Sequence, residues 1–455
     1  MLSNRNSRVS LVGAPVQSAP ENIDMDEGAS KLSVIWTILK KLGTSDVSSV
    51  RMSLPANLME PRSNLEFWNY NDRPDYFISL SDSLDPAERM LHVLRWFLCK
   101  DTKWKAQHPQ LRKPYQPVLG EFLQCEWSVP NESAPTFHQS TSSGANSAKT
   151  PRASIEGTDV DAASLAATLV TPETEQVTIS CISEQLVHSP SVSAFYYECK
   201  ERGGISARGV DHVTAKFTGT AVKIGPGEFN HGVYVNLNKW GEEYNCSFPW
   251  ASVAGWISGN PYITVSDVTT VVCEKSKLKC ILLYKDEPFF GAPKFAVEGK
   301  IFRYDPELDR TKPVKDLKKI DDADVVATIW GQWNGKIYAK LNGQQEGLLL
   351  DLQASETAVM RTPPIDEQAE NESRRIWEHV SNAIHAKDFA QATKLKRDTE
   401  DEYRKIRAQK GSAHKSKYFD FKVPLLSSDH SDTSTLMERG KPYLKDGITL
   451  GLARK

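Results

Sequence analysis

The sequence predicts a mainly β protein with flanking helices, an α+β chain built around one large antiparallel sheet. Segments with apolar residues at every second position follow one another between residues 176 and 351, with no helical stretch between them. Helical spacing of apolar residues occurs only before this region and again after Pro363. Successive strands without intervening helices favour an antiparallel meander, which forms either a barrel or a sandwich.

The clearest strand-like segment is HGVYVNLN, in which Val233, Val235 and Leu237 fall on one face. Gly, Pro, Asn or Asp residues separate it from similar segments, which are VTISCIS, DHVTAKFTGTAVKI, YITVSDVTTVVC, KCILLYK and KIYAKLNG. This regular punctuation is typical of strands that turn back on their neighbours. It supports the antiparallel arrangement.

Three helical regions flank the strands. The spacing of Leu32, Ile35, Trp36 and Leu39 predicts a short apolar helix, which either packs on its own domain or acts as a movable cover. Asp85–Leu98 predicts a better helix, because Asp85 can cap it and Pro86 suits its first turn. A third helical region runs from about residue 367 to 410 and is interrupted near its middle.

Composition shifts divide the chain into three parts. Residues 1–29 are rich in polar residues and predict a disordered N-terminal segment. Residues 30–410 form one domain, and within it residues 131–175, rich in Ser, Thr, Ala and Gly, predict a disordered insertion. Residues 411–455 predict a polar C-terminal tail.

Composition also excludes several classes of partner. The formal net charge of −2 provides no basic field for nucleic acid. The seven cysteines are dispersed, with no CxxC pair and no zinc spacing, so we expect reduced thiols in the cytosol and no metal. No signal-peptide core is evident, and no apolar run approaches the roughly 18 residues that span a bilayer. We therefore expect a cytosolic monomer that meets membranes peripherally.

Catalytic motifs are missing from the sequence. It contains no HExxH, no GxSxG, no P-loop and no dinucleotide-binding glycine fingerprint, and its ten histidines are dispersed. We expect a protein that is not an enzyme, with no cofactor and no catalytic residue.

Several motifs, in order along the chain, resemble those of the oxysterol-binding protein family. KPYQPVLGEF (113–122) is similar to its KPxNPxLGE signature, and EQLVHSPSVSAFYYE (184–198) is similar to its EQVSHHPPxSAF fingerprint. SLPANLMEPRSNLE (53–66), DPAERMLHVLRWFL, FFGAPKFAVEGKI and NESRRIWEHV resemble further parts of it. The resemblance is to short, single-domain members that lack a pleckstrin-homology region. It implies a large β-barrel around a lipid tunnel, covered by a helical lid containing Trp36 and its apolar neighbours.

The resemblance also implies a head-group site for a phosphoinositide. Its members here are Lys113, His188, Ser189, Lys396, Glu400 and Arg404. The signature loop supplies Pro114, Gln116, Pro117, Leu119, Gly120 and Glu121. Spacings of four and eight residues place Lys396, Glu400 and Arg404 along one helix face. The resemblance implies that the two cations reach phosphate there and that the glutamate orients them.

Three residues depart from the family pattern, and one of them, Ser191, stands where the family has a second proline. Ser189 stands where the family has a second histidine, and it cannot carry a positive charge. Losing one charge-assisted hydrogen bond weakens binding by roughly 1–3 kcal/mol, which is about one to two decades in affinity. Gln116 replaces an asparagine of the signature and adds a methylene group. We therefore expect weakened head-group binding.

These observations predict a lipid-transfer protein that carries a sterol or phosphatidylserine between membranes and exchanges it for phosphatidylinositol 4-phosphate. The alternative is a lipid-gated sensor or scaffold, which binds lipid without net transfer. The altered HSPS segment favours the sensor, since weaker counter-ligand binding blunts exchange. The apolar lid helix and the intact Lys396 set favour transfer.

Overall fold

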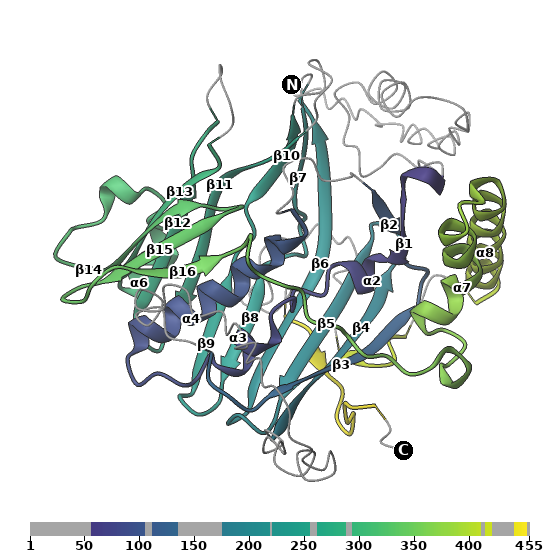
Figure 1. Ribbon diagram of the computed structural model, residues 1–455, viewed down its shortest axis with the longest axis horizontal. Helices are drawn as coiled ribbons and strands as arrows, with labels where there is room; N and C mark the ends of the chain where they lie inside the picture. Colours follow the sequence, from purple (N-terminus) through teal and green to yellow (C-terminus); the bar gives the residue numbers. More distant parts are fainter. Residues whose placement is uncertain are drawn as a thin grey trace, which may run out of the picture.

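The computed structural model describes residues 56–104, 112–134, 175–218, 221–254, 262–287, 294–410, 415–420 and 441–452 (Figure 1). The predicted lid residues Leu32, Ile35, Trp36 and Leu39 lie outside the described residues, as does the segment 1–29. Most of the predicted insertion, residues 135–174, also lies outside them. Among the described helices, none combines the length and apolar character needed to cross a bilayer.

A large antiparallel sheet dominates the described part of the chain, which confirms the predicted mainly β class with flanking helices. Its strands are β3 (Phe122–Pro130), β4 (Gln176–Val187), β5 (Val192–Cys199), β6 (Ile205–Phe217), β7 (Val222–Pro226), β8 (Val233–Leu237), β9 (Glu242–Cys246), β10 (Trp250–Ala254), β11 (Tyr262–Cys273), β12 (Leu278–Tyr284), β13 (Ala296–Arg303), β14 (Val325–Gln332), β15 (Lys336–Leu341) and β16 (Gly347–Asp351).

The sheet is split in its middle, between two long strands. One half of β6 pairs with β7 and the other half with β8. In the same way β11 pairs with β10 along one half and with β9 along the other. The remaining strands follow the chain on either side, β3–β4–β5–β6 and β11 to β16 (Figure 1). The predicted inward face of β8 is confirmed, because Val233, Val235 and Leu237 are fully buried in the main core.

The chain after β16 covers the free edge of β3. Glu126 and Arg361 exchange both backbone hydrogen bonds at 2.9 Å, and the backbone N–H of Phe122 donates to the carbonyl of Asn371 at 3.1 Å. A sheet edge presents unpaired N–H and C=O groups that invite other chains to pair. The strand order of the described residues ends at β3 on this side, so the returning segment protects it.

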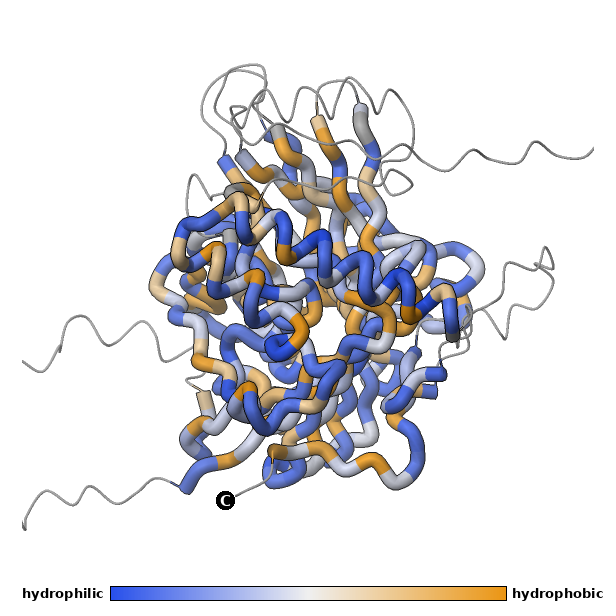
Figure 2. Tube along the Cα trace, turned by 90° about the vertical axis from the view of Figure 1, so that its right-hand side faces the viewer, coloured by the Kyte–Doolittle hydropathy of each residue, from blue (hydrophilic) through white to orange (hydrophobic). Residues whose placement is uncertain are grey.

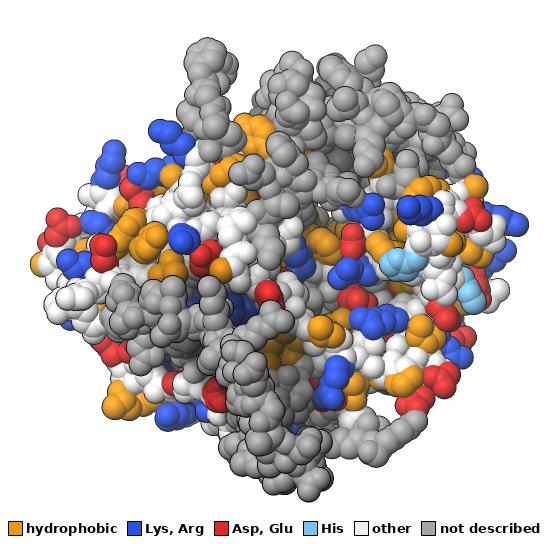
Figure 3. Space-filling model, in the orientation of Figure 1, with side chains coloured by type: hydrophobic (Ala, Val, Ile, Leu, Met, Phe, Trp, Pro, Cys, Tyr) orange, Lys and Arg blue, Asp and Glu red, His pale blue; other side chains and the backbone are white. Residues whose placement is uncertain are grey.

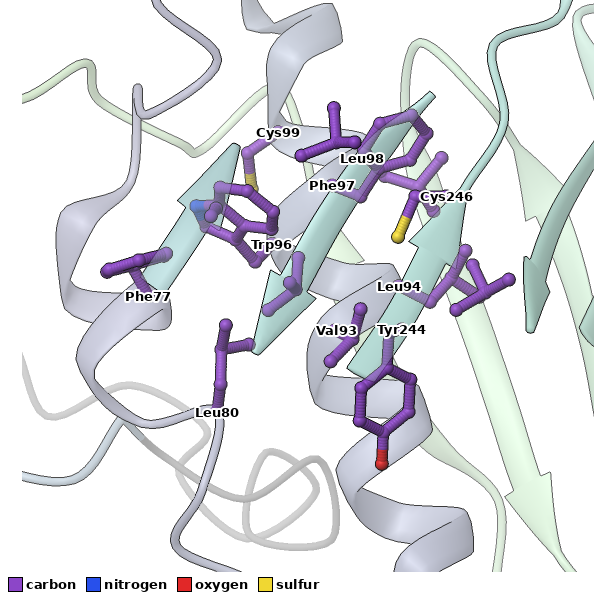
Figure 4. Close-up of a cluster of buried hydrophobic side chains, with 14 of the residues drawn as sticks. Phe77, Leu80, Val93, Leu94, Trp96, Phe97, Leu98, Cys99, Tyr244 and Cys246 are labelled. Carbon is purple, nitrogen blue, oxygen red and sulfur yellow. The ribbon is translucent and has the colours of Figure 1, made fainter. Parts of the chain in front are cut away.

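Helix α4 (Pro86–Leu98) packs across the inner side of the sheet and contacts β9, β12 and β16. The predicted start is confirmed: Asp85 accepts the backbone N–H of Ala87 at 2.8 Å, and Pro86 begins the helix. The Trp96 side chain faces Phe77, with ring centroids 5.3 Å apart (Figure 4). The helix is buried on nearly all sides, its three basic side chains included.

The other described helical elements are short, apart from the hairpin of α7 (Ser373–His385) and α8 (Phe389–Lys410). They are η2 (Ala56–Leu58), α2 (Asn64–Phe67), α3 (Pro74–Ile78), η3 (Cys99–Trp104), α6 (Pro306–Thr311), η5 (Leu317–Lys319) and η6 (Ile365–Glu367). The α7–α8 hairpin matches the predicted helical region with a break near its middle. Seen from the side of this hairpin, the outer turns are largely hydrophilic (Figure 2).

The helical hairpin packs on two short parallel strands, β1 (Met59–Ser63) and β2 (Lys113–Tyr115). A separate hydrophobic cluster joins them, and it includes Met59, Tyr115, Trp377 and Val380. Burial of these side chains fixes α7 against the strand that begins with the signature lysine.

Part of the segment predicted as a polar tail packs on the outer face of the sheet. The strands β17 (Phe419–Asp420) and β18 (Tyr443–Leu444) pair with each other, and Tyr418 and Phe419 are buried against β3 and β4. The buried carboxylate of Glu184 accepts hydrogen bonds from Ser416 Oγ and from the backbone N–H groups of Lys417 and Tyr418 at 2.6–2.9 Å. These bonds satisfy a buried charge that would otherwise be costly.

Candidate head-group site

The signature loop folds over the end of β4. Pro114 and Pro117 are buried, and Gly120 turns the chain with φ +79°, a conformation that glycine adopts without strain. The backbone N–H of Gly120 then donates to the carbonyl of Gln185 at 3.0 Å, and the N–H of Gln185 donates to the carbonyl of Glu121 at 2.8 Å. The loop is thereby joined to the strand that leads into the fingerprint segment.

Glu121 ties the signature loop to α7. Its side chain is fully buried and accepts from the backbone N–H of Val118 at 2.9 Å, Ser373 Oγ at 2.7 Å and Trp377 Nε1 at 3.0 Å. Burial raises the pKa of this carboxyl, while the same hydrogen bonds act to lower it. The predicted signature glutamate therefore has a supporting position, directed at protein donors.

An aromatic stack fixes the strand that carries Lys113. The rings of Tyr115 and Trp377 are 4.7 Å apart at 26°, and Tyr115 Oη lies 3.2 Å from Ser381 Oγ. Burial raises the pKa of Tyr115 to about 12, so the phenol stays neutral. The stack holds β2 and α7 in a constant relation.

The structure brings the signature loop and the fingerprint turn together. Gln116 Nε2 donates to the carbonyl of His188 at 3.1 Å, so the longer glutamine side chain spans the gap. Gln185 Nε2 donates to Ser191 Oγ at 3.0 Å and to the carbonyl of Val187 at 2.7 Å, which fixes the turn from inside. His188 is half-buried, and Ser189 is exposed beside it.

Lys113, Lys396 and Glu400 form the charged centre of the site. Lys396 Nζ lies 2.7 Å from a carboxylate oxygen of Glu400, and only 8% of the lysine side chain is exposed. Lys113 is accessible to solvent but closely surrounded by protein. Burial and the positive charge of Lys396 lower its pKa, and Glu400 acts in the opposite direction. Two neighbouring cations, one of them paired with a carboxylate, are suited to a phosphate.

Arg404 is placed differently. Its side chain is about half exposed and forms an ion pair with Asp401, three residues earlier on α8. Engagement with a ligand would therefore require it to exchange Asp401 for the phosphate. Leu119 is half-buried in the signature loop.

Sequence reasoning missed a polar row on the inner face of the sheet. Gln185, Ser193 and Asp211 are direct cross-strand neighbours on β4, β5 and β6. Tyr70 Oη donates to Asp211 at 2.5 Å, and burial raises the pKa of this carboxyl to about 7. Among the described residues, Gln185 Oε1 and Ser183 Oγ are buried without a hydrogen-bond partner. The residues are far apart in sequence, so only the strand register could reveal the row.

The described residues contain no group of three or more metal-ligating side chains. The family model described as oxysterol-binding protein matches residues 34–389. The chain belongs to the oxysterol-binding protein family. The signature and fingerprint motifs that meet at this site are those that suggested the family from sequence. Lipid binding and lipid transfer are the activities of this family.

Relatives of the family extend over most of the chain. Oxysterol-binding protein-like protein 1 of Schizosaccharomyces pombe is 33% identical, covering 98% of this chain and 99% of that protein. Oxysterol-binding protein-related protein 9 of Xenopus tropicalis is 27% identical, covering 82% of this chain but 44% of its own length. The vertebrate relative is thus about twice as long as the portion of it that matches this chain.

Solved structures of the family share the fold. The Osh1 ORD domain in complex with ergosterol superposes with a TM-score of 0.58 at 17% identity, covering 85% of this chain and 82% of that one. The Osh3 ORD of Saccharomyces cerevisiae in complex with PI(4)P gives a TM-score of 0.57 at 15% identity, covering 86% and 87%. At this identity the likeness establishes the fold.

Proposed function

We propose that this protein carries a sterol or phosphatidylserine between membranes and exchanges it for phosphatidylinositol 4-phosphate. The observation that supports exchange most directly is the proximity of Lys113, Lys396 and Glu400 beside the turn that contains His188. A relative of the same fold was solved with a sterol and another with PI(4)P. No chemical step is needed, so the protein acts as a carrier, working as a monomer in the cytosol and at membrane surfaces.

The two ligands place different demands on this site. A phosphomonoester needs cationic donors, and Lys396 supplies one that is held in place by Glu400. A sterol is apolar over most of its surface and needs chiefly burial from water. In the proposed exchange both lipids use the apolar inner face of the sheet, and only the phosphoinositide uses the lysines.

The matching experiment compares Lys396→Ala with Lys405→Ala, an exposed lysine on the same helix. Loss of a charge-assisted hydrogen bond of about 1.5–3 kcal/mol predicts roughly a 10- to 100-fold weaker phosphatidylinositol 4-phosphate affinity for Lys396→Ala. Binding of a fluorescent sterol should change little in either variant. Equal phosphoinositide affinity in both variants would remove Lys396 from the site and leave a binder of one lipid type.

A further inference from the structure

A pocket lies at the turn between α7 and α8, and we call it the elbow pocket. It has a volume of about 420 Å³ and is lined by Met59, Glu60, Pro61, Arg62, Arg112, Ile384, His385, Lys387 and Phe389. Ligand pockets in proteins commonly have volumes of about 300–1,000 Å³. None of these residues belongs to the head-group set derived from the sequence.

The charges around the elbow pocket are mostly positive. Arg62 lies 3.0 Å from Glu60, so these two side chains largely neutralise each other. Arg112, His385 and Lys387 are exposed at the rim, and within the described residues no acidic side chain forms an ion pair with them. Two cationic side chains and the ring N–H of a histidine are therefore available to an anion.

At the elbow, Lys387 has a strained backbone conformation. The backbone N–H of Asp388 donates to the carbonyl of Ala383, and that of Lys387 to Ile384, both at 2.9 Å. This is the helix-ending pattern in which the residue at the Lys387 position takes a positive φ, here +61°. Glycine is usual there, and a lysine in this left-handed conformation is strained. The side chain of Asp388 accepts from the N–H of Gln391 and so caps α8.

The floor of the pocket is apolar. Met59, Pro61 and Ile384 line it, and Phe389 stands at its edge with 37% of its surface exposed. An exposed phenylalanine beside cations is the combination found on surfaces that lie against a bilayer interface. A small soluble anion would use the cations alone. This favours a lipid surface as the occupant.

The elbow pocket lies on the same elements as the head-group site. Arg112 directly precedes Lys113, and Phe389 lies seven residues before Lys396 on the same face of α8, a rise of about 10 Å. Figure 3 shows Lys, Arg and His side chains, interspersed with Asp and Glu, over the right-hand part of this face, around α7, α8 and the short strands. A membrane that touches the elbow would bring its lipids close to Lys113.

We propose that the elbow pocket binds the phosphate group of an acidic phospholipid that stays in the bilayer, and so docks the head-group site on the membrane. The purpose of this docking rests on the proposed lipid exchange, but binding to the membrane can be measured independently of that exchange. Arg112 and Lys387 hold the phosphate, His385 adds a ring N–H donor, and Phe389 enters the interface. The lipid bound at the elbow is not the lipid that is carried.

The test is co-sedimentation of the full chain with phosphatidylcholine vesicles, with and without phosphatidylserine. Arg112→Gln/Lys387→Gln should bind the acidic vesicles about 25-fold less tightly, the loss of two cationic contacts at about 1 kcal/mol each. The control is Lys318→Gln/Lys319→Gln, which removes two exposed lysines between α6 and β14. It should bind like the wild type.

Two further measurements separate the possible outcomes. Binding of a fluorescent sterol in solution should be the same in the elbow variant and the wild type. If the wild type itself bound no sterol, that result would count against the proposed function and leave the docking site untouched. Equal vesicle binding by the elbow and control variants would overturn the docking site. Tight binding of inorganic phosphate, with no preference for acidic vesicles, would also overturn it and assign the pocket to a soluble anion. The same lack of preference with binding to an acidic peptide would assign it to a protein partner.

Discussion

Replacing Glu121 should separate the hydrogen-bonding role of this side chain from its charge. Alanine leaves the Val118 N–H and the Trp377 Nε1–H without an acceptor in a fully buried place, while the Ser373 hydroxyl can rotate away. Each buried unsatisfied donor costs about 1–3 kcal/mol, and the lost side-chain volume adds to this. Relief of the buried charge returns part of the cost. We expect Glu121→Ala to lower the free energy of unfolding by about 3 kcal/mol.

Glutamine provides the matched comparison. Its Oε1 can accept from both Val118 and Trp377, and its Nε2 can donate to Ser373 Oγ once the hydroxyl turns. We expect Glu121→Gln to cost less than about 1.5 kcal/mol. Urea titration followed by tryptophan fluorescence measures both free energies. Trp377, which contacts Glu121, is one of the fluorophores. If alanine and glutamine cost the same, the three hydrogen bonds do not hold the signature loop.

Three other predictions concern the fingerprint, the inner face and the insertion. Ser189→His with Ser191→Pro should strengthen phosphatidylinositol 4-phosphate binding by about tenfold, since it restores one charge-assisted contact, as competition with a fluorescent sterol will measure. Asp211→Asn should leave stability unchanged near pH 4 and raise it increasingly up to pH 7. The folded pKa of about 7 exceeds the ordinary 3.8, so the native aspartate loses stability across that window, by up to about 4 kcal/mol. Denaturation at both pH values tests this, and a pH-independent difference contradicts it. Replacing residues 135–174 by a short Gly-Ser turn should change the unfolding free energy by less than about 1 kcal/mol, because the backbone of Asn131 already bonds to residue 175 at 2.7 Å. A sharp fall in the melting temperature of this variant would show that the insertion belongs to the core.

Local signals in the sequence predicted the elements whose folding is local. Asp85 and Pro86 marked the start of α4, because capping and a fixed proline φ act over a few residues. Period-two alternation identified β8 and placed Val233 and its partners inside. The family motifs indicated where the signature loop and the fingerprint turn belong, and the described residues place them side by side through Gln116 and His188.

Contacts between distant residues could not be predicted in this way. Tyr70 and Asp211 are 141 residues apart, and their hydrogen bond depends on the register of β6. The elbow pocket joins residue 112 to α7 and α8, which no local pattern relates. Arg404 illustrates the opposite problem, since helical spacing aligns it with Lys396 but the nearer Asp401 competes for its charge.

The seven cysteines can report on local opening of the native protein. All seven are buried and reduced, and none forms a disulfide. Burial raises the pKa of Cys199 to about 11 and that of Cys280 to about 12, so few thiolates exist near neutral pH. Cys99 directly follows α4, and Cys246 lies on β9, a strand that α4 contacts (Figure 4). Alkylation of these two thiols requires α4 and the sheet to separate, so its rate under native conditions reports how often that opening occurs.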